Sequence, residues 1–351
     1  PEYRLPGDML NIDIENIKNA GVKIKTNTRI GKDILFKELL SSYKAVFIAT
    51  GAHKSRKLRI PNEDAEGVID AIEFLRDINS NKKVNIGKNV GIIGGGNAAI
   101  DAARAVVRIK DCNKVLVIYR RTRKEMPAFE EEISAAIEEG VEIQFLTAPT
   151  KIITKNRKIA GVKCTKMKLG EVDENGRRKP IPIEGSELVI NLDTLIVAIG
   201  EDPDLCFLDE ENNIEVSKRG TIVVCPETLA TNIDGVFAGG DVVTGPNTVI
   251  DAMSAGKIAA EMIDKYIRGK VLAREYKLTR PSMYVAPPAE LAEKDIGEAA
   301  RPEVPCLPVN KRINNFNEVN LNITEEAAIR EARRCLRCDL ETEDGEKAIK
   351  S

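Results

Sequence analysis

Short apolar runs alternate with amphipathic segments along the first 270 residues of the chain. Continuous apolar runs, typical of strands buried on both faces of a parallel sheet, cover residues 45–49, 90–93 and 195–199. Apolar positions at helical spacing predict helices over residues 8–20, 71–78, 97–107, 128–139 and 249–266. This alternation of strands and helices predicts an α/β fold with parallel strands.

Four segments break this alternation. Residues 22–26 alternate apolar and polar side chains, which predicts an exposed strand, and residues 214–216 and 221–224 predict two further short strands. Residues 150–191 are rich in predicted hairpins, with a turn at 173–176 whose sequence is Asp-Glu-Asn-Gly. Beyond residue 270 the chain is richer in proline and irregular until a predicted helix over 325–334.

Composition narrows the class of protein. The 53 basic and 55 acidic residues nearly cancel, so no basic footprint for nucleic acid and no polybasic membrane patch is indicated. No apolar run is long enough to insert into a membrane, and no signal peptide is visible, so we expect a cytoplasmic protein that handles small molecules. Because the chain begins at Pro1, with its first element already under way, we expect it to be a piece of a longer polypeptide.

The most informative stretch is a glycine-rich turn between a predicted strand and a predicted helix. Gly94, Gly95 and Gly96 follow the apolar run, and Asn97 and Ala98 open the helix. Gly94 suits a tight turn, and Gly96 allows the backbone to approach a diphosphate at the positive end of the helix dipole. The third small position, at residue 99, is alanine. These residues predict a Rossmann-like dinucleotide site in the context that such a motif requires.

Two adjacent arginines indicate which dinucleotide is bound. At the end of the second strand of such a site, an acidic residue favours NAD and positive charge favours the 2′-phosphate of NADP. This position holds Arg120 and Arg121, whose guanidiniums can pair bidentately with a phosphate. We therefore predict NADPH rather than NADH, the alternative being a solvated basic turn.

A second turn, Gly239-Gly240-Asp241, follows another apolar strand and precedes the helix that begins near Thr248. A carboxylate in this place can accept a hydrogen bond from a ribityl hydroxyl, and the helix N-terminus can face the electron-rich edge of a flavin. From the residues alone it is also simply a strand, a turn and a helix.

Taken together and in order, these motifs resemble the two-dinucleotide-binding flavoproteins, the pyridine nucleotide-disulfide oxidoreductase superfamily. Within it, three runs are similar to the small (beta) subunit of NADPH-dependent glutamate synthase, and the resemblance covers about residues 1–270. The runs are 1–6 (Pro-Glu-Tyr-Arg-Leu-Pro), 120–128 (Arg-Arg-Thr-Arg-Lys-Glu-Met-Pro-Ala) and 247–253 (Asn-Thr-Val-Ile-Asp-Ala-Met).

The resemblance implies an NADPH-binding domain inserted into an FAD-binding domain. In this chain the first part of the FAD domain would cover 1–82, the NADPH domain 83–200, the second part of the FAD domain 201–270, and an extended tail 271–351. The family's FAD domain opens with its own glycine-rich motif, which is missing before Pro1. The resemblance therefore implies FAD for the parent protein more firmly than for this chain alone.

The resemblance also implies which residues hold the cofactors and what reaction follows. The residues implied at the cofactors, besides those of the glycine-rich turn and the two arginines, are Thr50, Gly51, Gly200, Gly240, Asp241, Thr248 and Val249. Asp241 would hold the ribityl chain, and Thr248 and Val249 would lie at the pyrimidine end of the flavin. Hydride passes from NADPH to FAD between the cofactors themselves, so no catalytic side chain is expected.

Cys335 and Cys338 form the one C-x-x-C pair among seven cysteines, so the chain is not a secreted disulfide framework. Their surroundings, Glu-Ala-Arg-Arg-Cys-Leu-Arg-Cys, resemble the opening of the family's iron–sulfur segment. Three interpretations are open: half of a [4Fe-4S] site completed elsewhere, a zinc site or disulfide, and an incidental pair.

These observations favour an NADPH-dependent flavoprotein that passes electrons to iron–sulfur centres on a partner redox subunit or iron–sulfur protein. Two alternatives are a non-catalytic nucleotide-binding and docking module of a larger complex, and a dithiol enzyme similar to thioredoxin reductase. The oligomeric state is not indicated by the sequence. We further expect the glutamates at 130–132 and 138–139 to form a solvated helix face, Met253 to lie in the core, and His53 to lie in a loop.

Overall fold

The computed structural model describes residues 1–110, 112–173, 176–208, 213–274, 302–332 and 347. The chain divides into two compact units, one made of Pro1–Arg274 and Val309–Asn317 and the other of Glu275–Pro308 and Glu318–Ser351. In the described part of the second unit, Cys306 and Asn320 form an antiparallel bridge, and helix α10 (Glu325–Ala332) follows. None of the described helices is long and apolar enough to cross a membrane.

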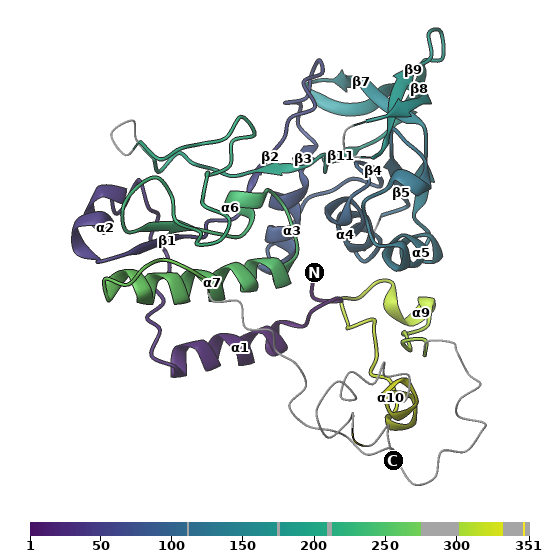
Figure 1. Cartoon of the computed structure of the whole chain (residues 1–351). Coiled ribbons are helices and arrows are strands. Elements are labelled where there is room, and N and C mark those ends of the chain that lie inside the picture. The colour runs from purple at the N-terminus through teal and green to yellow at the C-terminus, as the bar shows by residue number, and fades with distance from the viewer. Residues whose placement is uncertain (111, 174–175, 209–212, 275–301, 333–346, 348–351) are drawn as a thin grey trace. The chain divides into compact units, whose positions relative to one another are not determined.

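A five-stranded parallel sheet dominates the first unit (Figure 1). Its strands, in spatial order, are β3 (Val68–Asp70), β11 (Thr194–Val197), β4 (Asn89–Ile93), β5 (Lys114–Ile118) and β6 (Glu142–Gln144). Every neighbouring pair is parallel, and β4 at the centre pairs with both β5 and β11. The predicted α/β class is confirmed.

Three helices cover one face of this sheet because alternate strand residues point toward them. The helices are α3 (Ala71–Asn79), α4 (Asn97–Val107) and α5 (Glu130–Glu138). Val90 and Ile92 of β4 belong to the core shared with these helices, and neither is exposed to solvent. The next residue, Ile93, lies in a different core on the opposite face, as the two-residue period of a strand requires.

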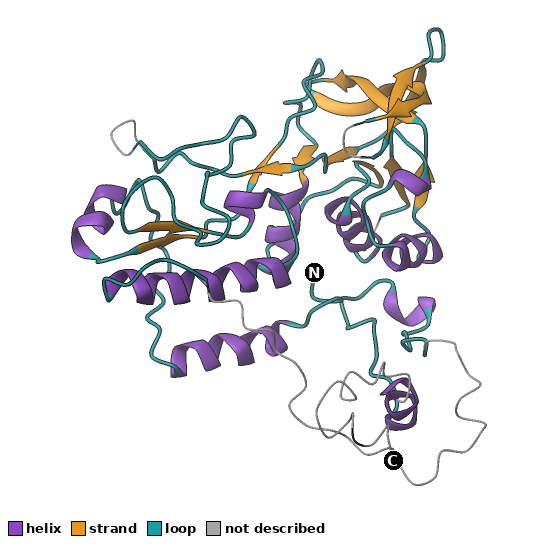
Figure 2. Cartoon of the chain, viewed as in Figure 1, coloured by secondary structure: helices purple, strands orange, loops and turns teal. Residues whose placement is uncertain are grey.

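An antiparallel sheet covers that opposite face (Figure 2). Its strands are β7 (Thr147–Lys155), β8 (Lys158–Val172), β9 (Arg178–Pro182) and β10 (Leu188–Asn191). Ile152 and Val162 from β7 and β8 pack with Ile93, Leu116 and Ile118 of the parallel sheet. The predicted hairpins are confirmed by the antiparallel pairing of these strands. The Gly176 N–H donates to the Asp173 carbonyl, and residues 174–175 of the predicted turn lie outside the described residues.

A smaller parallel pair joins two segments far apart in sequence, β1 (Val46–Ile48) and β13 (Val236–Ala238). Around it lie α2 (Phe36–Ser42), α6 (Asp241–Thr244) and α7 (Val249–Ile267). Helix α1 (Gly7–Asn19) has no buried residue. The hydrophobic core beside this strand pair contains Phe36, Ile48, Phe207, Val236 and Ala238.

The chain leaves β1 for the five-stranded sheet along one segment and returns from that sheet to β13 along another, and the two segments pair with each other. These segments are β2 (Lys54–Ser55) and β12 (Glu201–Asp202), which run antiparallel. Arg56 adds an ion pair to Asp202 with an N–O distance of 2.6 Å.

A buried charge cluster, not foreseen from the sequence, stands between α4 and α5. The Glu139 carboxylate has no exposed surface and pairs with Arg104, Arg108 and Arg312. The expectation of a solvated face at 130–132 and 138–139 is therefore wrong for Glu139. It is also wrong for Glu132, which pairs with Arg104 and Arg4 and is 15% exposed in its side chain. Arg312 belongs to the short helix α9 (Val309–Arg312), so the cluster also explains why residues 309–317 belong to the first unit.

Three other expectations are corrected. Residues 22–26 form no strand, and Val22 and Ile24 are exposed, because no described strand lies beside them to accept backbone hydrogen bonds. The two strands expected at 214–216 and 221–224 reduce to a single bridge between Val216 and Ile222. Met253 is 55% exposed because it lies on the outer face of α7.

Candidate nucleotide-binding and flavin-binding sites

The glycine-rich turn sits where β4 ends, and its first two glycines are required by close packing within the protein. Gly94 has a φ of +150°, and a Cβ there would lie 2.2 Å from the carbonyl oxygen of Ala198 at the end of β11. A Cβ on Gly95 would lie 2.5 Å from the ring of Tyr119. Any side chain at either position would displace backbone or a buried ring.

Gly96 differs from both because its side-chain position faces open space. Its φ is −89°, which any residue can adopt, and the nearest atom to a Cβ there is Cγ of Pro127 at 3.8 Å. Gly96 is the N-cap of α4 and makes no side-chain cap. The backbone N–H groups of Asn97 and Ala98 make no hydrogen bond to the residues that the structure describes. The turn therefore offers free donors and an open approach, which is the arrangement that holds a diphosphate.

The start of α4 is braced by the segment that follows η1 (Arg123–Glu125). The Ala128 N–H donates to the Gly95 carbonyl at 3.2 Å, and the Phe129 N–H donates to Asn97 Oδ1 at 3.1 Å. Ala99, the third small residue of the motif, is fully buried and packs against Gly94. These hydrogen bonds hold the glycine-rich turn and the segment after β5 together.

The two arginines after β5 lie in different environments. The Arg121 guanidinium is buried, pairs with Asp173 at 2.9 Å, and donates from Nε to the Arg178 carbonyl at 2.6 Å. Arg120 is exposed and has no hydrogen bond or ion pair among the described residues. Partial burial, with the positive charges of Arg121 and Arg177, holds the pKa of Arg120 below its usual value, so an anion beside it would be stabilised.

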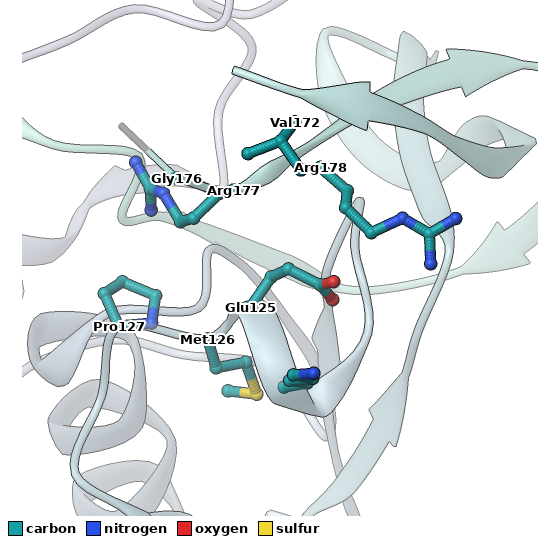
Figure 3. A pocket seen from close by; sticks show the side chains of 8 residues that line it. Glu125, Met126, Pro127, Val172, Gly176, Arg177 and Arg178 are labelled. Carbon is teal, nitrogen blue, oxygen red and sulfur yellow. The ribbon is translucent and has the colours of Figure 1, made fainter. Parts of the chain in front are cut away.

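A pocket of about 310 Å³ opens between the segment after β5 and the turn that joins β8 to β9. One wall is Lys124, Glu125, Met126 and Pro127, and the other is Val172, Gly176, Arg177 and Arg178. Figure 3 shows Arg177 above Pro127 and Arg178 extending to the other side, toward Glu125. Because Pro127 is also the residue nearest to Gly96, the pocket adjoins the open side of the glycine-rich turn.

The flavin-side candidates gather at the carboxyl ends of β1 and β13. Thr50 and Gly51 follow β1, and Gly240 and Asp241 follow β13. The Gly239 N–H donates to the Ile48 carbonyl at 3.0 Å, which holds the two strand ends together. Gly240 has a φ of +73°, and Asp241 Oδ1 accepts from the Asn247 N–H at 3.2 Å.

The remaining candidates lie near this edge or outside the described residues. Thr248 is the N-cap of α7, and its hydroxyl accepts from the Asp251 N–H, while Val249 is 76% exposed. Gly200, with a φ of +121°, accepts from the Arg56 N–H at the β2–β12 crossing. Cys335 and Cys338 lie outside the described residues. Among those described there is no group of three or more metal-binding side chains.

The turn residues Asp173, Arg177 and Arg178 were missed by the sequence reasoning. The available signal was the pair of arginines that directly follows the Asp-Glu-Asn-Gly turn. Their proximity to Arg120 and Arg121 arises only when the antiparallel sheet folds back over the parallel one.

A parallel sheet with a glycine-rich turn at its central strand, free helix N–H groups and a basic edge defines an α/β dinucleotide-binding protein. Residues 8–256 match the model of the family described as pyridine nucleotide-disulphide oxidoreductase. The chain belongs to this family, and the resemblance stated from the motifs is confirmed.

Three curated relatives place the chain more closely. It is 43% identical over 348 residues to the NADP(+)-dependent formate dehydrogenase subunit beta of Moorella thermoacetica, covering 96% of this chain and 48% of the relative. It is 37% identical over 367 residues to the NADPH-Fe(3+) oxidoreductase subunit beta of Geobacter sulfurreducens, covering 96% of this chain and 54% of that relative. It is 34% identical over 286 residues to the NADPH glutamate synthase small chain of Azospirillum brasilense, covering 78% of this chain and 59% of that relative. The chain thus spans about half the length of the first two relatives.

A solved structure shows the same fold. Mycobacterium tuberculosis FprA in complex with NADPH superposes with a TM-score of 0.58 at 19% identity, covering 74% of this chain and 71% of that one. At this identity the likeness concerns the fold alone.

Proposed function

We propose that this chain carries the NADPH-binding part, and part of the FAD-binding part, of an oxidoreductase subunit that passes electrons to a partner redox subunit or iron–sulfur protein. The observation that carries the proposal is the open turn at Gly96, with the free N–H groups of Asn97 and Ala98. The unpaired guanidinium of Arg120 stands at the end of the next strand. Diphosphate and 2′-phosphate are the two anions that such a site takes.

The domain division 1–82, 83–200, 201–270 and 271–351 is part of the proposal. The pairing of β2 with β12 supports the boundary after residue 200, since β12 begins there and is held against a strand of the proposed FAD-binding part. Two relatives are named beta subunits, which supports a partner redox subunit. The five described cysteines are free thiols, which fits the proposed cytoplasmic location because that compartment is reducing.

The residues at the β1–β13 edge fit a flavin. Asp241 Oδ2 has no hydrogen-bond partner among the described residues, so this oxygen can accept from a ribityl hydroxyl. Thr50, Gly51 and Gly240 leave the adjoining backbone without bulky side chains, and Thr248 and Val249 present the N-terminus of the 19-residue helix α7. FAD, when bound there, supplies the hydride acceptor and the one-electron steps.

The chain's own residues supply binding and orientation. Asn97 and Ala98 donate backbone hydrogen bonds to the dinucleotide, Arg120 compensates its charge, and Asp241 fixes the flavin chain. For the tail, we propose that Cys335 and Cys338 supply two of the four thiolates of a [4Fe-4S] cluster, the others coming from outside the chain.

The visible absorption spectrum of the purified chain tests the proposal. A flavin band near one flavin per chain, with NADPH-dependent reduction of ferricyanide, would show that the chain alone carries both cofactors. Asp241→Ala should lower flavin content because its Oδ2 is the oxygen proposed to hold the ribityl chain, whereas Asp251→Ala, one turn into α7, should retain it. A colourless protein that binds NADPH would instead establish a nucleotide-binding docking module.

A further inference from the structure

The pocket between residues 124–127 and the turn after β8 is lined by three cationic side chains, Lys124, Arg177 and Arg178. Arg120, four residues before Lys124, is near enough to Arg177 for their positive charges to interact. Arg121 is paired with Asp173, and Arg178 donates from Nε and Nη2 to the carbonyls of Gly170 and Leu169, each at 3.3 Å. Arg177 and Lys124, like Arg120, have no side-chain hydrogen bond or ion pair among the described residues. Positive side chains that have no carboxylate partner in the described part of the chain favour an anion.

Among the described residues, Glu125 is the carboxylate that lines the pocket, and of the lining cations its charge acts on Arg178. Glu125 is 8% exposed, and its Oε2 accepts hydrogen bonds from the Thr122 hydroxyl and backbone N–H in a capping box. The Thr122 bonds lower the pKa of Glu125, so this carboxyl is ionised but held within its own turn. The positive side of the pocket therefore remains available.

The turn that carries Arg177 is held in place by its own hydrogen bonds. The Asp173 N–H donates to the Arg177 carbonyl at 2.7 Å, and the side-chain oxygen Oδ1 of Asp173 accepts from the Arg177 N–H at 3.0 Å. The other carboxylate oxygen pairs with buried Arg121. The Arg121–Asp173 pair thus anchors the turn to the end of β5, and the Arg177 side chain takes no part in that anchor.

Location and chemistry together identify the anion. The pocket lies at the carboxyl end of β5, which neighbours β4, and it adjoins the open side of Gly96 through Pro127. In a dinucleotide site built on β4, this is the end that receives the adenosine ribose. A guanidinium offers two parallel donors to a phosphate, and two guanidiniums suit a dianion.

We propose that Arg177, from the turn between β8 and β9, binds the 2′-phosphate of NADPH together with Arg120 and so helps to select NADPH over NADH, while Arg121 positions the turn through Asp173. This inference rests on the proposed NADPH site. It adds Arg177, which follows Arg120 by 57 positions in the chain, to the residues that bind the dinucleotide. It also divides the roles of the adjacent arginines, one contacting phosphate and the other supporting the turn.

The test uses adenosine 2′,5′-bisphosphate and adenosine 5′-monophosphate as probes in titration calorimetry with the full chain. Arg177→Gln should weaken bisphosphate binding about 10-fold to 100-fold, the effect of losing one charge-assisted pair, and leave monophosphate binding unchanged. Lys179→Gln is the matched control because it removes one positive charge from an exposed position two residues away, outside the pocket lining. It should change bisphosphate binding less than about twofold.

Two results would overturn the inference. One is bisphosphate binding by Arg177→Gln that equals that of the unmodified chain. The other is an equal loss for both probes, which would indicate damage to the adenosine site rather than to a 2′-phosphate contact. If the unmodified chain binds bisphosphate no more tightly than monophosphate, the proposed NADPH site itself fails, and this result is distinct from the other two.

Discussion

Replacing Glu139 by glutamine is expected to lower the free energy of unfolding by about 3–5 kcal/mol, the usual cost of breaking a buried ion pair by removing one partner. The Glu139 carboxylate has no solvent-exposed surface. It accepts from Arg104 Nη2 at 2.6 Å and Arg108 Nη1 at 2.7 Å, and Arg312 Nε lies 3.1 Å from it. A neutral amide would leave these guanidiniums buried without adequate negative charge.

The comparison that isolates burial is Glu142→Gln. Glu142 pairs with Lys114 at 2.7 Å, but their side chains are 59% and 46% exposed, so its loss should cost less than about 1 kcal/mol. Urea unfolding of both variants measures the difference. Equal costs for the two substitutions would show that the cluster does not stabilise the first unit.

The pH dependence of stability, compared between the unmodified chain and Glu139→Gln, gives a second test of the Glu139 cluster. Burial alone raises the pKa of Glu139, but hydrogen bonds and charges from Arg108 and Arg104 outweigh it and hold the pKa below its ordinary value of 4.5. The stabilisation is therefore present above the unfolded pKa and is lost as pH falls from about 4.5 through the lower folded pKa. The stability gap between the unmodified chain and Glu139→Gln should narrow over that acid range.

The cluster ties distant parts of the chain to the nucleotide-binding sheet. Tyr3, 1% exposed, lies under the guanidiniums of Arg104 and Arg108, with ring distances of 4.8 and 4.1 Å. Arg4 pairs with Asp101 of α4, and Arg312 of α9 also donates to Glu138 at 2.6 Å. The N-terminal segment and residues 309–317 are thus anchored to α4 and α5, the helices that follow the glycine-rich turn.

Gly96→Ala is expected to weaken NADPH binding by about tenfold or more while leaving the fold intact. The added methyl meets no protein atom within 3.4 Å, and the φ of −89° suits alanine, so the only cost to the protein is a poorer N-cap, about 1 kcal/mol or less. The same methyl would occupy the space through which a diphosphate reaches the N–H groups of Asn97 and Ala98. Calorimetric titration with NADPH and a urea melt measure the two effects separately.

Gly94→Ala is the contrasting variant. Its Cβ would lie 2.2 Å from the Ala198 carbonyl oxygen at a φ of +150°, so it should destabilise the fold itself. Unchanged NADPH affinity in Gly96→Ala would mean that the dinucleotide does not approach the turn at this residue.

The sequence predicted the features whose causes are local. A strand, three glycines and an alanine-rich helix are contiguous, so β4, the turn and α4 follow from residues 89–107 alone, as does the hairpin from the Asp-Glu-Asn-Gly turn. The order of the motifs was also enough to identify the family.

Features built from distant residues were missed. Arg121 meets Asp173 across 52 positions and Glu139 meets Arg104 across 35, so neither partner is visible in a local window. One signal was available: Arg104 and Arg108 stand one turn apart in the alanine- and valine-rich second half of the helix, which implies buried cations in need of carboxylates. Met253 shows the opposite error, because an apolar side chain on a helix was assigned to the core and is exposed.

The proposed reaction is transfer of hydride from NADPH, held at the glycine-rich turn of β4, to a flavin. The most direct measurement is anaerobic rapid mixing of the flavin-containing protein with NADPH or NADH, followed by the loss of the flavin's visible absorbance. The account predicts complete bleaching in a single turnover by NADPH, about 100-fold faster than by NADH at equal subsaturating concentration. Bleaching at equal rates by the two nucleotides, or none with NADPH, would contradict it.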